Sequence, residues 1–374
     1  MQRLLLPVLL LAAGGATAQI PVPPPSVAAS SWLLLDLQSE QVLAERAAGE
    51  RVEPGALTLL MSAYVVFDAL EQKRLSLTEA LQVSDKAVRT PGARMYLKPD
   101  TRVNADELLR GMIVVPANDA AVALAEGVAG SEQHFVERMN AQARRLGLTD
   151  TVFANATGLP LSHHTSTPAN LARLAAALVR DYPQHLPLYQ LRSFTYNGVT
   201  QPNLNWLLGR DPRVDGLATG FTEDGGFSLV ATARHGDRRL LAIVTGASSE
   251  NLRAMEAQKL LNYGFQHYQT VLLYARGAEV AQLPVWKGST KTLSAGLDRD
   301  LFVSVPRGQA NLLKARLVSQ QPLLAPVSAR QPVGELELTF DGRPLGEYPV
   351  VALQGVSVAN VLVRLWDSLR LLFD

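Results

Sequence analysis

The sequence predicts an α+β domain, with helices packed on an antiparallel sheet, followed by a small all-β domain. The first observation behind this is order, because strand patterns open the chain, a run of helical patterns follows, and strand patterns return near residue 227. The second is a change of texture after about residue 270, where short alternating runs are separated by Gly, Pro and Asp. The length of 374 residues also favours two domains over one.

The composition is that of a folded protein and excludes several classes of function. Hydrophobic residues make up 47% and charged residues 18%, which rules out a disordered chain. The 35 Lys and Arg residues are balanced by 34 Asp and Glu residues, so we expect no nucleic-acid partner. The chain has no cysteine and no HExxH motif, and we therefore expect neither thiol chemistry nor a metal or other cofactor.

Residues 1–18 are expected to be a secretory signal peptide. Arg3 supplies a positive charge, an apolar core of about ten residues follows, and Ala16-Thr17-Ala18 matches the A-x-A cleavage pattern. That core is too short to span a bilayer, which takes roughly 20 residues. A Pro-rich linker over residues 19–28 then breaks any helix. These features predict an exported protein.

Residues 29–270 are expected to form the first domain. Ser31–Leu37 and Gln41–Ala44 have the pattern of a hairpin, and Ala56–Gln72 is apolar nearly all round, which is typical of a buried helix. Further helical patterns cover Ala105–Val114, Asp119–Val128, Ser131–Leu146, Thr167–Asp181 and Ser249–Tyr263. Two more strands are predicted at Phe227–Ala233 and Arg239–Val244.

Residues 271–355 are expected to form the small β domain, and Val356–Asp374 an amphipathic helix. Apolar residues recur in that helix every three or four positions, with Trp366 near the boundary of the apolar face. This pattern favours a helix lying in the plane of a membrane interface. A helix that packs on the β domain or on a second copy of the chain stays open as the alternative.

No motif in the chain identifies a nucleophile directly. Ser-x-x-Lys, Lys-Thr-Gly and Gly-x-Ser-x-Gly are all missing from the sequence. A Ser-His-Asp set stays open, because such residues meet only in three dimensions.

Four segments nevertheless carry a specific resemblance: Glu53–Val65, Asn118–Ala125, Leu146–Phe153 and Val214–Thr222. In these segments the chain resembles the low-molecular-mass penicillin-binding proteins of the serine-type D-alanyl-D-alanine carboxypeptidase family. The resemblance runs from about residue 29 to the end and includes the β domain and the final helix. It implies a transpeptidase domain like that of penicillin-binding proteins and β-lactamases, acting on peptidoglycan stem peptides outside the cytoplasmic membrane.

The resemblance also shows which positions match the family's catalytic motifs. The serine and lysine of Ser-x-x-Lys correspond to Ala56 and Leu59. Ser-x-Asn corresponds to the stretch from Pro116 to Asn118, in which only the asparagine is kept. Ala218 stands in place of the lysine of Lys-Thr-Gly. All four replacements are nonpolar.

The sequence therefore predicts a catalytically inactive homologue, a pseudoenzyme, that binds peptidoglycan or an envelope protein. A buried lysine without its partners is costly, so its loss is expected once the site no longer reacts. Thr58 and Ser62 are expected on helix faces other than that of position 56. Two alternatives stay open: a D-Ala-D-Ala carboxypeptidase whose nucleophile is displaced to Ser162, Ser166 or Ser228, and a membrane-attached scaffold.

Part of the site is still expected to bind substrate. The backbone N–H groups of Ala56 and Phe221 match the positions of the family's oxyanion hole. Asn118, Thr219, Gly220 and Phe221 are predicted to align a peptide along a strand edge. A structural role, as helix cap or strand-end packing, is the alternative for Asn118, Thr219 and Gly220.

The expected location follows from the signal peptide and the final helix. We expect a periplasmic protein that attaches peripherally to the outer face of the cytoplasmic (inner) membrane through residues 356–374.

Overall fold

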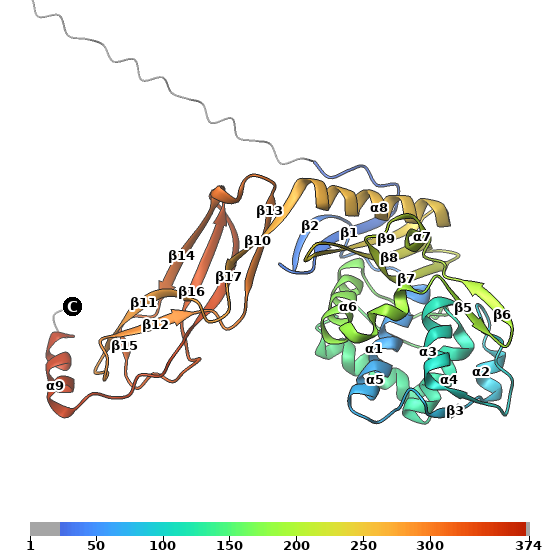
Figure 1. Ribbon diagram of the computed structural model, residues 1–374, viewed down its shortest axis with the longest axis horizontal. Helices are drawn as coiled ribbons and strands as arrows, with labels where there is room; N and C mark the ends of the chain where they lie inside the picture. The colour runs from blue at the N-terminus through green and yellow to red at the C-terminus, as the bar shows by residue number, and fades with distance from the viewer. Residues whose placement is uncertain (1–22, 372–374) are drawn as a thin grey trace, which may run out of the picture.

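The computed structural model describes residues 23–371, so the predicted signal peptide lies outside the described residues. Figure 1 shows a larger α+β body joined to a β domain, with α9 at the end of the β domain farthest from the larger body. The predicted fold class is confirmed.

A five-stranded sheet with the order β2-β1-β9-β8-β7 lies at the centre of the α+β body, and its neighbouring strands are all antiparallel. This order leaves β7 and β2 as the two edges of the sheet. The strands are β1 (Ser31–Asp36), β2 (Gln41–Arg46), β7 (Val214–Thr222), β8 (Gly226–His235) and β9 (Arg238–Ala247).

Helices cover both faces of this sheet, as Figure 1 shows. Alternation along β1 explains how one strand serves both layers: Leu33 and Leu35 face one core, and Trp32 and Leu34 face the other. The first core contains α1 (Leu59–Glu71), α3 (Ala105–Val114), α4 (Asn118–Ala129), α5 (Glu132–Arg145) and α6 (Pro168–Asp181). The second core lies under α8 (Glu250–His267).

Side-chain caps start three of the helices where the sequence predicts them. Ser131, Thr167 and Ser249 each accept a hydrogen bond from the backbone N–H three residues later, at 3.2, 3.1 and 3.1 Å. The short elements of this body are η1 (Gly55–Thr58), β3 (Ala80–Gln82), α2 (Asp85–Arg89), β4 (Arg102–Asn104), η2 (Pro183–Gln190), β5 (Ser193–Tyr196), β6 (Val199–Pro202) and α7 (Leu207–Arg210).

The β domain has its own hydrophobic core and a six-stranded sheet of order β14-β16-β17-β12-β11-β15, beside the pair β10-β13. Its elements are β10 (Tyr268–Tyr274), β11 (Glu279–Trp286), β12 (Thr292–Gly296), β13 (Leu301–Pro306), η3 (Ala310–Leu312), β14 (Leu313–Ser319), β15 (Leu323–Leu324), β16 (Pro332–Phe340) and β17 (Arg343–Ala352). A buried ion pair marks its junction with the α+β body. There Asp36 accepts from Arg238 at 2.8 Å and from Thr270 of β10 at 2.5 Å.

The final helix, α9 (Val361–Arg370), begins five residues later than predicted. Val356 is instead buried and exchanges backbone hydrogen bonds with Val327 at 2.8 and 2.9 Å. Asn360 then caps the helix by accepting from the N–H of Val363 at 3.0 Å. Pairing with a distant segment therefore outweighs the local amphipathic pattern over the first five residues.

Candidate functional site

The candidate site lies where η1 and the start of α1 meet the edge strand β7. A Cβ added at Gly55 would come within 3.0 Å of Thr222 Cγ2, and one added at Gly220 within 3.2 Å of the Pro54 carbonyl oxygen. Gly55 also has φ of +50°, which side-chain-bearing residues rarely adopt. The two glycines therefore let η1 approach β7 closely.

The positions that match the family's three motifs converge on one small cavity at this meeting point. Its volume is about 20 Å³. Its lining residues come from η1, α1, α3, η2, β7 and the loops after α3 and β6. They are Ala56, Leu59, Leu60, Met112, Ile113, Pro116, Tyr189, Asn203, Leu217, Ala218 and Thr219. The side chains around the cavity are thus mostly apolar.

Three of the predicted site residues lie outside this lining. Asn118 donates from Nδ2 to the carbonyl oxygen of Pro91 at 2.7 Å, and so holds the loop before α3. Gly220 packs against η1, as described above. Phe221 is 52% exposed, and its ring contacts that of Phe227 in a tilted arrangement with 4.5 Å between ring centroids. None of these three residues is among those that line the cavity.

The polar side chains Thr58 and Ser62 at the same helix start each make a hydrogen bond to a neighbouring segment. Thr58 Oγ1 lies 2.9 Å from Nε2 of His164, and Ser62 donates to the carbonyl oxygen of Ala156 at 2.6 Å. Burial lowers the pKa of His164 to about 4, so its imidazole is neutral at pH 7. Both residues are fully buried, and neither is among those that line the cavity.

The three serines considered as displaced nucleophiles do not line the cavity. Ser162 is exposed beside His163, whose Nδ1 lies 3.2 Å from its Oγ. Ser166 is buried and shares a 2.8 Å hydrogen bond with Thr151. Ser228 is buried on β8, paired with Gly220. The sequence alone did not show that these serines lie outside the lining, because their positions depend on the fold.

Among the residues of the site that the sequence reasoning missed are Tyr189 and Arg253. Tyr189 lines the cavity from η2, a short 3-10 helix that carries no strong pattern. Arg253 is 3% exposed and donates to the carbonyl oxygens of Gly220 and Leu204 at 3.1 and 3.3 Å. Its burial lowers the pKa of the guanidinium. An arginine within a helical pattern ordinarily indicates a solvent-facing position, so no signal marked it.

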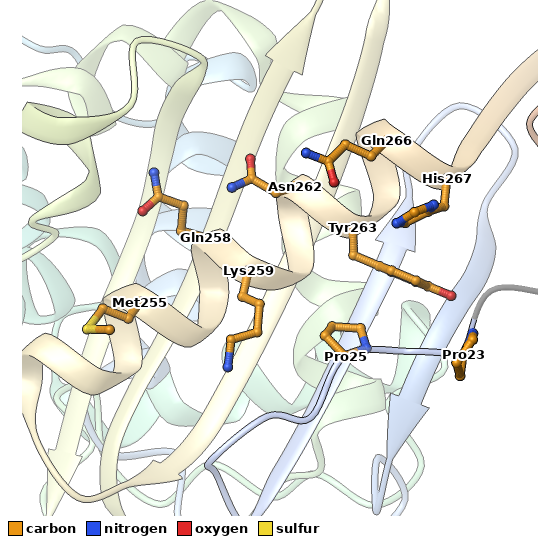
Figure 2. A pocket seen from close by; sticks show the side chains of 9 residues that line it. All are labelled: Pro23, Pro25, Met255, Gln258, Lys259, Asn262, Tyr263, Gln266 and His267. Atoms are coloured by element: carbon orange, nitrogen blue, oxygen red, sulfur yellow. The ribbon is translucent and has the colours of Figure 1, made fainter.

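A larger groove of about 500 Å³ runs along α8, and Figure 2 shows the nine residues that line it. Tyr263, Lys259 and His267 of α8 lie on one side, and Pro23 and Pro25 of the N-terminal segment on the other. None of the predicted site residues belongs to this groove. Within residues 23–371, no group of three or more His, Asp or Glu side chains is placed to hold a metal ion.

Comparison with known proteins identifies the family. Residues 17–249 match the family model described as D-alanyl-D-alanine carboxypeptidase, and residues 268–357 match the C-terminal domain of penicillin-binding protein 5. This chain belongs to the D-alanyl-D-alanine carboxypeptidase family. The resemblance seen in the sequence is confirmed.

Similar proteins match this family member over nearly its whole length. The D-alanyl-D-alanine carboxypeptidase DacC of Escherichia coli K12 is 36% identical, with 95% of this chain and 91% of DacC covered. DacA of the same organism is 35% identical, with 93% and 89% covered. Among solved structures, penicillin-binding protein 5 from Haemophilus influenzae has a TM-score of 0.87 at 32% identity, with 90% of this chain and 99% of that chain covered.

These relatives contradict the prediction of a catalytically inactive protein that acts by binding alone. Proteins named as carboxypeptidases match 93% or more of the chain at 35–36% identity, which favours the alternative that this chain is an enzyme. The prediction was based on four side chains, at positions 56, 59, 116 and 218. Catalysis also depends on backbone donors and on binding, which those four side chains alone do not decide.

Proposed function

We propose that this protein is a D-Ala-D-Ala carboxypeptidase that acts on peptidoglycan stem peptides, with an attacking oxygen that does not come from position 56. The observation that carries the proposal is the near full-length identity to proteins named for this activity. The convergence of the motif-matching positions on one cavity supports it from the geometry.

The edge strand β7 is the proposed binding platform for the peptide. An edge strand has unpaired backbone groups to which an extended peptide can add. Thr219, Gly220 and Phe221 follow one another along that edge, and Asn118 is the first residue of α4. The N–H groups of Ala56 and Phe221 would bind the developing oxyanion. Arg253 donates to the carbonyl oxygen of Gly220, and its positive charge is proposed to stabilise the terminal carboxylate of the bound peptide.

The proposed chemistry is acyl transfer followed by hydrolysis. A hydroxyl oxygen attacks the carbonyl carbon of the penultimate D-Ala, the C–N bond breaks, and the hydroxyl proton passes to the nitrogen of the departing D-Ala. Water then hydrolyses the ester, which releases the shortened peptide and restores the hydroxyl. The described lining offers two hydroxyls, those of Thr219 and Tyr189. Burial raises the pKa of Tyr189, which disfavours its phenolate. We therefore assign the attacking oxygen to Thr219.

The proposed enzyme is expected to be slow. No Asp, Glu, His or Lys side chain is among the described residues that line the cavity, so no general base lies beside Thr219. General acid–base catalysis contributes about 10²–10⁴-fold in rate. We expect turnover at least about 100-fold below that of a relative with complete motifs.

The test is release of D-Ala from a purified pentapeptide that ends in D-Ala-D-Ala. The full mature chain should release D-Ala faster than buffer, and Thr219→Val should abolish that release. The matched control is Ser162→Ala, which removes an exposed hydroxyl outside the cavity and should leave the rate unchanged. Release no faster than in buffer, from protein shown to be folded by circular dichroism, would overturn the proposal.

We further propose that residues 1–18 direct export, and that the first domain, the β domain and the final helix divide near residues 270 and 355. The pairing of β10 with β13 supports the first division.

In this view the protein is periplasmic and α9 lies in the membrane interface. Leu362 is 78% and Trp366 63% exposed, which supports this role. None of the helices within residues 23–371 is both long and apolar enough to cross a bilayer.

Flotation with vesicles of phosphatidylethanolamine and phosphatidylglycerol tests the proposed attachment. Replacing Leu362 and Leu365 by Ser should reduce the vesicle-bound fraction several-fold, because both side chains are exposed on α9. The matched control replaces the exposed Val42 and Val199 by Ser. Equal binding by the two double variants would exclude α9 as the anchor.

A further inference from the structure

The hydroxyl of Tyr189 is buried without a hydrogen-bond partner among the described residues. The residue is 2% exposed, and η2 presses it against β7, where a Cβ added at Gly216 would come within 3.2 Å of Tyr189 Cβ. Buried hydroxyls are nearly always hydrogen-bonded, and leaving one unpaired is destabilising. The position of Tyr189 on the cavity wall suggests what its hydroxyl binds.

The other groups that line the cavity do not satisfy this hydroxyl. Asn203 bonds to other groups: Nδ2 donates to the carbonyl oxygen of Leu191 at 3.0 Å, and Oδ1 accepts from the N–H of Asn205 at 2.9 Å. The remaining described lining is apolar except for Thr219. The cavity therefore has a mostly apolar lining, in which Tyr189, Thr219 and Asn203 carry the polar side-chain groups.

Size and charge limit what such a chamber can hold. A volume of about 20 Å³ is enough for one water-sized group, since roughly 10–15 Å³ is the least that a water needs. No charged side chain is among the described residues of the lining, and an ion without a partner would be strongly disfavoured there. The phenol keeps its proton, because burial raises the pKa of Tyr189, and so it can donate.

We infer that this cavity is a binding site for one small neutral polar group, held by the hydroxyl of Tyr189. Water supplies that group in the free protein. In the complex it is an amide or hydroxyl group of the stem peptide, or the same water bridging to the peptide, and this second step rests on the proposed function. Tyr189 is then a positioning residue for the peptide on β7.

The first test does not depend on enzyme activity. Crystal structures of the full mature protein and of Tyr189→Phe are compared at a resolution that shows ordered water. A density peak about 2.6–3.2 Å from Oη in the wild type, lost in the variant, is the expected result. A cavity without such a peak, or an Oη bonded to a protein group, would overturn the inference. If Tyr189→Phe does not fold, Ala218→Val serves instead, because its added methyl groups should expel the peak.

The second test measures the affinity of the protein for the peptide. Tyr189→Phe should raise the Kd for a D-Ala-D-Ala-terminated peptide about fivefold to tenfold, the effect of one hydrogen bond, with no loss of melting temperature. Tyr274→Phe, in β10 of the β domain, is the matched control. An unchanged Kd would remove Tyr189 from peptide positioning. A wild type that binds no peptide would count against the proposed function, while the crystallographic result would still decide the content of the cavity.

Discussion

The two sides of η1 and the first turn of α1 differ in polarity although they belong to one short stretch of chain. Ala56 and Leu59 face the cavity and are nonpolar. Thr58 and Ser62 face the opposite way, where each makes a short hydrogen bond to a neighbouring segment.

This difference shows that the fold and the chemistry of the site depend on different side chains of the helix. The polar contacts that fix α1 against the segment from Ala156 to His164 are all present. The polar groups expected toward β7 are replaced by apolar ones. The scaffold of the family is therefore kept by one side of the helix and does not require the other side to be polar.

Restoring polar residues on the cavity side should have the largest effect on reactivity. The variant carries Ala56→Ser, Leu59→Lys, Pro116→Ser and Ala218→Lys, all at positions that line the cavity. Because such groups act as a unit, we expect labelling by fluorescent penicillin to rise by about 100-fold or more. Ala56→Ser alone is the control and should change little, since its hydroxyl has no base. A folded quadruple variant with the wild-type rate would show that the cavity lacks the geometry of a catalytic centre.

Lowering the pH should destabilise the folded protein through His164, which contacts Thr58 on the polar side. The pKa of His164 is about 4 in the folded protein, against about 6.5 in an unfolded chain, because burial disfavours the imidazolium. The unfolded state therefore binds more protons between these values, so stability is lost as the pH falls from about 6.5 to about 4. The shift corresponds to about 3 kcal/mol in the free energy of unfolding.

Urea unfolding across this pH range measures the effect. His164→Gln should flatten the dependence, and His163→Gln, in the exposed loop next to it, should leave it unchanged. An identical pH dependence in wild type and His164→Gln would mean that His164 is not the group that titrates.

The sequence predicted much of this scaffold because local signals agree with the final packing. α3 has the predicted bounds, and the capping residues of α5, α6 and α8 stand where they were expected. The features it missed depend on distant partners. The late start of α9 follows from the pairing of Val356 with Val327, and the burial of Tyr189 follows from the docking of η2 on β7. No window of neighbouring residues contains that information.

The smallest predicted effect separates the stability of the polar side from the activity of the cavity side. Ser62→Ala removes the buried hydrogen bond to the carbonyl oxygen of Ala156, and leaves that acceptor without its side-chain donor. We expect the free energy of unfolding to fall by about 1–2 kcal/mol, and the rate of D-Ala release to stay the same. Ser162→Ala, at an exposed hydroxyl, should change stability by less than about 0.5 kcal/mol. A Ser62→Ala variant with wild-type stability and altered D-Ala release would link the two sides of the helix and contradict their independence.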